Sequence, residues 1–350
     1  MSRHISWPSI GQFRETVKAV QHRAIYVGKD DEGNVIVDRT RKAPTLTFVG
    51  TCKVHGTNAS VAFGQGEMWC QSRSNIITPQ YDNAGFAMFV ESCKITFAEI
   101  LMNGLHAVEF NDTTDTMVVF GEFCGGNIQK GVAITGLPKM FIVFGMALVD
   151  AEGNKTYLTK DQVLQSMRDC NVPNIFNIWQ FQTFEVEIDF ENPHLIQNEL
   201  NKLTELVGDQ CPVGFSFGVT GVGEGIVWAP KDEPYRQDSG LWFKVKDERH
   251  SQSKVKTLAA VDVERFENIK ALAETLANNG RLQQGVQEVF NTLNGGEVDI
   301  KRMGDFIRWV MQDVFKEEMD TITASGFNGK EISGPVSKIC RDFILHELEV

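Results

Sequence analysis

The sequence predicts an α+β protein with three parts: a mixed, largely antiparallel sheet domain (residues 1–246), a linker (247–256) and a small all-helical domain (257–350). Up to residue 246, short apolar runs alternate with Gly-, Asn- and Asp-containing turns, a pattern typical of strands. Beyond residue 257, apolar residues recur every three or four positions, which indicates helices. The segment between is charged and poor in large apolar residues, so we interpret it as a linker.

Seven apolar runs are predicted to be the main strands of the first domain: 46–49, 60–63, 68–70, 117–120, 140–149, 225–228 and 241–245. Gly64-Gln65-Gly66 connects two of them as a hairpin. A polar turn at 29–34 lies between two further short strands, and a second turn at 150–154 ends the longest strand. Because these turns join strands that follow one another in the chain, we expect the joined strands to pair antiparallel.

Four helices are predicted in the first domain. One follows Pro8 and spans about 7–27, and a second begins at Ala84 and stops at Gly104. Thr159 begins the third, with Gln162 in capping-box register. The fourth opens at Asn192-Pro193 and ends before Gly208.

In the helical domain, Met303 begins an apolar stripe that continues to Phe315 at helical spacing. Ser333-Gly334-Pro335 is predicted to open the last helix, whose inward residues include Cys340 and Ile344. A helical core is the direct explanation of both patterns.

Composition sets broad limits on function. The chain has 350 residues, 42% of them hydrophobic, which is enough for a substantial core. The net charge of −12 argues only weakly against a nucleic-acid partner, because a basic groove can lie on an acidic body. The seven cysteines form no C-x-x-C pair, so we expect reduced thiols and no zinc site. With no signal peptide and no run of about 18 apolar residues, we expect a soluble, cytoplasmic monomer away from membranes.

Polar or charged residues stand at the ends of several predicted strands and carry the functional prediction. They form five short islands: 53–58 (Lys-Val-His-Gly-Thr-Asn), 71–74 (Gln-Ser-Arg-Ser), 119–126 (Val-Phe-Gly-Glu-Phe-Cys-Gly-Gly), 224–227 (Glu-Gly-Ile-Val) and 242–246 (Trp-Phe-Lys-Val-Lys). Charges at strand ends converge on a cleft, where perturbed groups do chemistry.

Lys244 and Lys246 are two positions apart, so on a strand their side chains share a face. Two cations on one face are costly as neighbours unless an anion lies between them, and a phosphate is the natural anion. Nearby cations also favour the neutral amine of Lys53, which at its ordinary pKa of about 10.4 is no nucleophile at neutral pH. We therefore infer a lysine that attacks phosphorus in a bound triphosphate.

The five islands, in this order, resemble the covalent nucleotidyltransferases. Among these they are similar to the double-strand RNA ligases of bacteriophages, relatives of the kinetoplastid RNA-editing ligases, over about residues 46–250. The resemblance implies an ATP-grasp-like ligase core followed by a helical domain. It also implies ATP as AMP donor, Mg²⁺ or Mn²⁺ as metal, and RNA, as a nicked duplex, as partner.

The resemblance also implies roles for individual residues. Lys53 matches the lysine that becomes adenylylated. Asn58 and Arg73 match residues needed for the lysyl-AMP and 5′-phosphate transfer steps, and His55 matches a histidine important for ligation.

Further matches concern the nucleotide. Glu122 matches the acid that contacts the ribose, and Phe144 the aromatic that stacks on adenine. Glu224 matches an acid involved with the metal and sealing. Lys244 and Lys246 match the pair that contacts the AMP phosphate. Simpler explanations exist for several positions: Glu122 as the ion-pair partner of a nearby lysine, and Phe144 as core packing.

Three positions depart from the pattern of the relatives. Cys52 and Val54 flank the nucleophile and are expected near the nucleotide, but Cys52 stands where phage relatives carry a glutamate. Gly145 replaces an acidic residue that commonly follows the stacking aromatic. The segment 228–230 (Trp-Ala-Pro) lacks the basic residue often found before its proline.

The function predicted is therefore ATP-dependent RNA ligation of 3′-OH and 5′-phosphate ends. A DNA ligase or mRNA-capping enzyme is the first alternative, although those proteins normally carry an OB-fold where this sequence predicts helices. A non-catalytic RNA-binding module with a decayed ligase fold is the second. A basic stretch from Lys244 to Lys256 is expected to hold the nucleic-acid backbone.

Overall fold

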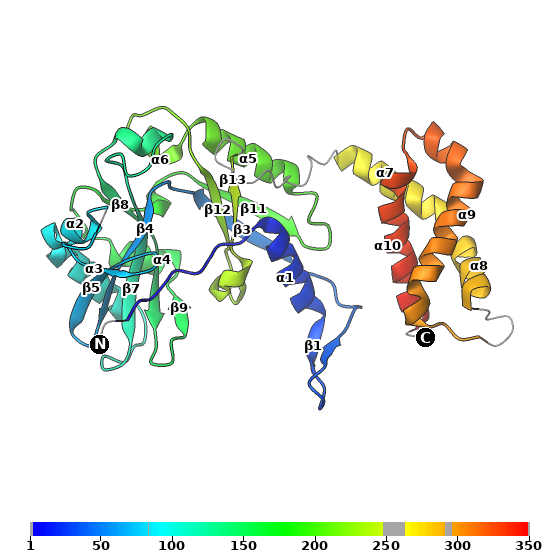
Figure 1. Cartoon of the computed structure of the whole chain (residues 1–350), viewed down its shortest axis with the longest axis horizontal. Coiled ribbons are helices and arrows are strands. Elements are labelled where there is room, and N and C mark those ends of the chain that lie inside the picture. Colours follow the sequence, from blue (N-terminus) through cyan, green and yellow to red (C-terminus); the bar gives the residue numbers. More distant parts are fainter. Residues whose placement is uncertain (1–2, 83, 248–262, 291–295, 349–350) are drawn as a thin grey trace. The chain divides into compact units, whose positions relative to one another are not determined.

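The computed structural model describes most of the chain, namely residues 3–82, 84–247, 263–290 and 296–348. It divides into two compact units, Met1–Ala260 and Val261–Val350, which are described separately (Figure 1). The predicted linker and basic stretch lie outside the described residues beyond Asp247, so the domain boundaries at 246 and 257 remain predictions.

The larger sheet of the first unit has seven strands, in the order β10-β8-β7-β4-β5-β6 with β9 beside β8. Its neighbours pair antiparallel, except for β10, which pairs parallel with β8. The strands are β4 (Thr57–Gly64), β5 (Glu67–Ser72), β6 (Ile76–Ile77), β7 (Thr116–Cys124), β8 (Met140–Val149), β9 (Lys155–Tyr157) and β10 (Ile175–Asn177).

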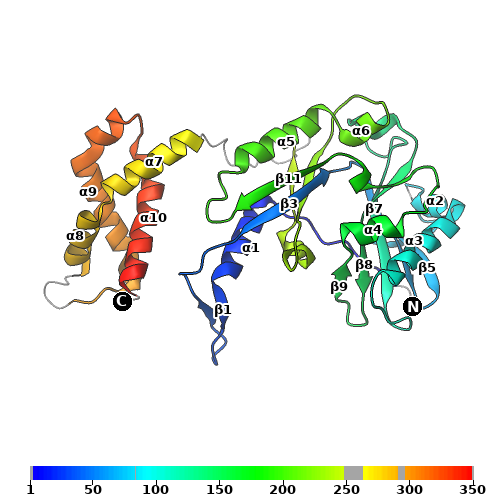
Figure 2. The same cartoon turned by 180° about the vertical axis from the view of Figure 1, so that it is seen from behind.

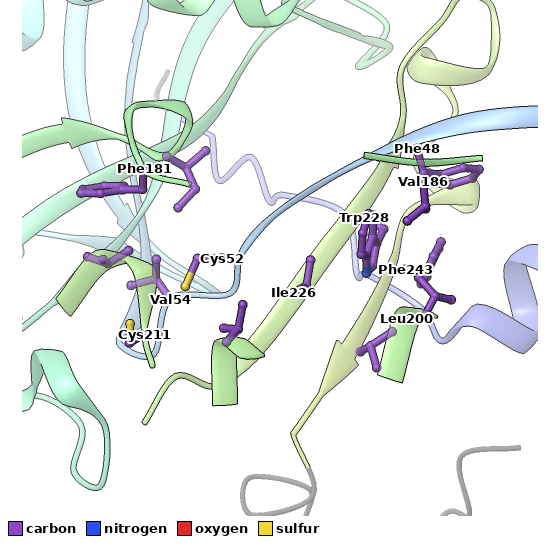
Figure 3. Close-up of a cluster of buried hydrophobic side chains, with 14 of the residues drawn as sticks. Phe48, Cys52, Val54, Phe181, Val186, Leu200, Cys211, Ile226, Trp228 and Phe243 are labelled. Atoms are coloured by element: carbon purple, nitrogen blue, oxygen red, sulfur yellow. The ribbon is translucent and has the colours of Figure 1, made fainter. Parts of the chain in front are cut away.

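A second sheet has four antiparallel strands in the order β11-β3-β12-β13. They are β11 (Thr183–Asp189), β3 (Thr45–Cys52), β12 (Gly225–Pro230) and β13 (Phe243–Lys246). Helix α5 (Gln197–Asp209) runs along this sheet and buries Leu200 and Val207 against it (Figure 2). Phe48, Trp228 and Phe243 fill the core beneath it (Figure 3). The predicted α+β class with mixed, largely antiparallel sheets is confirmed.

The other elements of this unit are smaller. They are α1 (Phe13–Ile25), the hairpin of β1 (Tyr26–Lys29) and β2 (Val35–Val37), α2 (Phe86–Ser92), α3 (Lys94–His106), α4 (Lys160–Ser166) and α6 (Pro212–Ser216). Thr159 caps α4 in the predicted capping box with Gln162. Helices α2 and α3 pack Phe86 and Phe97 onto the seven-stranded sheet.

The single helix predicted from Ala84 to Gly104 is wrong. The segment forms two helices that break at Cys93, whose backbone leaves the helical region (φ −132°, ψ 33°). The second helix continues past Gly104, because that glycine serves packing rather than termination. A Cβ there would lie 2.5 Å from Met146 Cε.

The helix expected at Asn192-Pro193 also begins late, at Gln197. Strands β6, β9, β10 and β11 are absent from the predicted set, and the longest of them is β11, which pairs with β3 over seven residues. Its sequence alternates Phe184, Val186 and Ile188 with acidic residues, a period-two signal that was available.

The second unit is helical, as predicted. Its helices are α7 (Val263–Leu276), α8 (Asn279–Phe290), α9 (Met303–Ala324) and α10 (Gly329–Glu347). The predicted stripe of α9 points into the core, with Phe306, Val310 and Val314 fully buried. The predicted start of α10 is wrong: Asn328 caps the helix in a capping box with Glu331, so Pro335 lies inside it. Among the described residues, no helix is both long and apolar enough to cross a membrane.

Candidate active site

A pocket of about 1210 Å³ opens in the first unit, with walls from both sheets. It is lined by all but two of the predicted site residues, namely Cys52, Lys53, Val54, Asn58, Arg73, Glu122, Phe144, Lys244 and Lys246. The two others, His55 and Glu224, are connected to the pocket through Lys53, because Glu224 contacts Lys53 and His55 contacts Glu224. The sequence-distant strand ends therefore converge as predicted.

Glu224 organises the charged end of this pocket. Its carboxylate is only 3% exposed and accepts from Lys53 Nζ at 2.6 Å and from Lys246 Nζ at 2.8 Å. His55 Nδ1 lies 3.1 Å from the same oxygen as Lys53. Burial alone raises the pKa of the Glu224 carboxyl, but the Lys53 charge and hydrogen bonds from both lysines outweigh it and lower the pKa overall. The carboxylate is therefore held ionised between cations.

Strand register brings these three elements together. β12 lies between β3 and β13, so Gly225 faces Lys246 while Ile226 faces Cys52, the residue before the nucleophile. The Lys53 backbone N–H donates to the Gly225 carbonyl at 2.8 Å, which fixes the loop after β3 onto β12. Gly225 has φ +147°, and a Cβ there would lie 2.2 Å from the Val245 oxygen, so this approach requires glycine.

Lys244 and Lys246 share a face of β13, as predicted. Both side chains are half-buried and line the pocket. The residue between them, Val245, and the residue before them, Phe243, are buried. Burial, followed by the charges of Lys246 and Lys53, lowers the pKa of Lys244 below its ordinary value. Its position suits an incoming anion.

Glu122 stands on the opposite wall. It is on β7, directly across from Asn58 on β4, and its Oε1 accepts from the Gly56 N–H at 3.0 Å. Burial raises the pKa of the Glu122 carboxyl to about 7, despite the opposing charge of Lys53. Gly56 has no space for a side chain, because a Cβ would lie 2.4 Å from the Phe123 oxygen. The nucleophile motif is thus fixed to both sheets.

The far end of the pocket is aromatic. Phe144 is half-buried and lines the pocket, so its ring is open to a ligand although it also packs on the core. Trp7, Tyr157 and Trp242 line the pocket as well; only Trp242 lies in one of the predicted islands, and none of the three is among the predicted site residues. They come from distant segments, and isolated aromatic residues carry no spacing signal.

Two other predicted residues have distinct surroundings. Arg73 is exposed at the pocket edge, with its Nη2 3.4 Å from the Ser9 hydroxyl. Cys52 is 3% exposed. A hydrogen bond with the Cys211 side chain, together with burial, raises the pKa of the Cys52 thiol well above its ordinary range.

The residues of this site fit a divalent metal that is held partly by water and by substrate phosphates. Within the described residues, no group of three or more His, Cys, Asp or Glu side chains could hold a metal ion alone. Two carboxylates, Glu122 and Glu224, flank Lys53. Mg²⁺ commonly binds through one or two carboxylates, water and substrate phosphates, and this donor set fits that mode.

Comparison with protein families then gives a direct result, because the family model described as RNA ligase matches residues 46–246, more than half of the chain. The chain belongs to the RNA ligase family. The match begins at β3 and ends with Lys246, so it contains nearly all of the charged pocket. This also agrees with the predicted nucleotidyltransferase superfamily.

Solved structures of an RNA ligase from Naegleria gruberi are similar to part of this chain. One contains pyrophosphate (13% identity, TM-score 0.44), another is a mutant with ATP and manganese (12%, 0.45), and a third a mutant with AMP and manganese (12%, 0.45). In each case the match covers 71% of this chain and 58% of the Naegleria chain.

Proposed function

We propose that this protein is an ATP-dependent RNA ligase of the bacteriophage double-strand type, which seals nicks in duplex RNA through a covalent lysyl-AMP. The observation that carries the proposal is the position of Lys53. Its amine lies against a buried carboxylate shared with Lys246, beside a pocket large enough for a nucleotide. Family membership supports the same chemistry.

In the first step, the deprotonated Lys53 amine attacks the α-phosphorus of ATP. An N–P bond forms, the bond to the β-phosphate oxygen breaks, and pyrophosphate leaves; the amine proton passes to solvent at the open pocket. Glu224 keeps Nζ in place before the attack. Lys244 and Lys246 stabilise the negative charge that builds up on the phosphate oxygens.

The remaining residues hold the nucleotide. Phe144 offers an aromatic face for the adenine, and Glu122 accepts hydrogen bonds from the ribose on the opposite wall. Val54 and Cys52 flank the nucleophile. A divalent metal, when bound, neutralises the triphosphate, and Glu224 is the residue we expect to contact it directly or through water.

The second step transfers AMP from Lys53 to an RNA 5′-phosphate, and the third joins the neighbouring 3′-OH to that phosphate with release of AMP. Arg73, exposed at the pocket edge, is suited to the incoming 5′-phosphate. Asn58 is expected to act beside it, and His55 to act in sealing. The helical unit is proposed to recognise the duplex around the nick.

Labelling with [α-³²P]ATP and Mg²⁺ or Mn²⁺ tests the first step. We expect the wild-type protein to carry label, and Lys53→Ala to carry none. Lys94→Ala is the matched control, because Lys94 is an exposed lysine paired with Glu91 away from the pocket. An unlabelled wild type that still binds RNA would instead support the non-catalytic RNA-binding module.

A substrate panel tests the finer proposal. We expect faster sealing of a nicked duplex with RNA on the 3′-OH side than of single strands. A strict preference for DNA on that side would favour a DNA ligase, and label from GTP rather than ATP would favour a capping enzyme.

A further inference from the structure

Residues 3–11 run from the seven-stranded sheet toward α1 (Figure 1), and residues 7–10 of this segment line the pocket. At one end, Ile5 exchanges two hydrogen bonds with the buried amide of Gln71 on β5, at 2.7 and 3.1 Å. At the other end, Gly11 donates to the Trp242 carbonyl at 3.3 Å and accepts from the Lys244 N–H at 3.1 Å. This segment is therefore held to the seven-stranded sheet and to β13 of the four-stranded sheet.

Trp7 lies between these two attachments and within the pocket wall. Its indole contacts four aromatic rings, with centroid distances of 4.9 to 5.3 Å: Phe120, Phe144, Tyr157 and Trp242. It meets Phe144 edge-on, at 62° between the ring planes. Such contacts fix ring orientation, since edge-to-face pairs have a preferred geometry.

Gly145 shows how closely the indole fits. A Cβ at this position would lie 2.3 Å from the Trp7 ring, so any side chain there would have to displace the tryptophan. The position directly follows Phe144, the proposed stacking residue. The space that a side chain at 145 would fill beside the base is occupied by Trp7.

We propose that Trp7 is a specificity-determining residue that forms the wall of the base end of the nucleotide pocket. It limits the size of the base and holds Phe144 in its stacking orientation. Selection at this end rests on shape, since the indole presents a large apolar surface with one donor. This inference rests on the proposed function, because it assumes that the nucleotide base lies beside Phe144.

The test is a gain of function. Trp7→Ala opens space, so we expect it to form a covalent adduct with ATP analogues that carry a bulky base substituent, such as N6-benzyl-ATP or a C2- or C8-substituted ATP. The adduct with at least one of them should form about 10-fold faster than in wild type, the effect of removing roughly 1.4 kcal/mol of steric penalty. Trp7→Phe should form this adduct at a rate between those of the wild type and Trp7→Ala.

Trp69→Ala is the matched control. Trp69 packs against the same aromatic cluster and donates to the Arg3 carbonyl, but it does not line the nucleotide pocket. If Trp69→Ala admits the same analogue equally well, or if Trp7→Ala admits none, the proposal is overturned.

Binding gives an independent readout. In EDTA, calorimetry should show ATP binding roughly 3- to 10-fold weaker for Trp7→Ala than for wild type, with Trp69→Ala unchanged; equal affinities would contradict the proposal. Formation of the covalent adduct between the wild-type protein and ATP is measured first. Its absence would mean that the proposed function fails, whereas its presence with no effect at Trp7 would mean that only this inference fails.

Discussion

The two ends of the pocket are built in opposite ways. At the charged end, Lys53, Glu224 and Lys246 come from three adjacent strand ends and hold one another by ion pairs of 2.6 and 2.8 Å. At the aromatic end, Trp7 and Phe144 come from segments more than a hundred residues apart and meet only by packing. The difference suggests a division of labour, in which one end sets the reaction rate and the other sets nucleotide affinity and choice.

The largest expected effect lies at the charged end. Glu224→Gln keeps the shape of the side chain but removes the charge that holds Lys53 and Lys246. We expect lysyl-AMP formation to slow by about 100-fold or more, as for loss of one group that organises charge at a reaction centre. Single-turnover labelling measures the rate, and ATP affinity should change less than the rate. A pure affinity defect would break the proposed division.

The aromatic end should respond with the opposite signature. Phe144→Ala removes a stacking face worth about 1–3 kcal/mol, so we expect KM for ATP to rise by roughly 5- to 100-fold with a smaller change in kcat. Phe144→Tyr should retain most of the affinity, because its ring can still stack. A loss confined to kcat would assign Phe144 to the reaction rather than to binding.

Glu122 links the two ends and makes stability depend on pH. Its pKa is raised to about 7 in the folded chain, above the value of about 4.3 in an unfolded one, so the folded state disfavours the carboxylate. The resulting cost is absent below about pH 4, grows as pH rises, and is complete above about pH 7. Glu122→Gln should therefore gain about 3–4 kcal/mol in free energy of unfolding at pH 8 relative to pH 4, by urea denaturation. An equal gain in the free energy of unfolding at pH 4 and pH 8 would contradict the raised pKa of Glu122.

The smallest effect is expected at the pocket rim. Lys231 pairs with Glu185 at 2.9 Å, but both side chains are about half exposed. Exposed pairs contribute about 0–1 kcal/mol, so Glu185→Gln should shift Tm by no more than a few degrees. A large shift would mean that this rim pair, which joins β11 to the residue after β12, contributes substantially to the stability of the four-stranded sheet.

The charged end was predictable from sequence, and the reason is physical. Lys53, Glu122 and Lys246 stand at the ends of apolar runs, where charges converge. What sequence could not provide was their pairing. The cations were expected to surround a phosphate, whereas in the structure Glu224 is the anion between Lys53 and Lys246.

At the aromatic end, the resemblance assigns Phe144 and the fifth island contains Trp242, but Trp7 and Tyr157 escaped prediction because isolated aromatic residues carry no spacing signal. Trp7 gains its position from hydrogen bonds made by Ile5 and Gly11, which are tertiary contacts. The same limit explains one error in the helices, because Gly104 packs on Met146 and does not end its helix. The other error, the start of α10, has a local cause: the capping box at Asn328 outweighs the proline signal at 335.

The attachment of residues 3–11 to β13 also has a consequence for synthesis. The pocket wall needs Trp7, made first, and the strand that carries Lys244 and Lys246, made more than two hundred residues later. Contacts of such long sequence separation form slowly and late. If Lys53 reacts with ATP as proposed, a ribosome-bound chain becomes competent only after β13 has left the exit tunnel, because the pocket wall is incomplete before then.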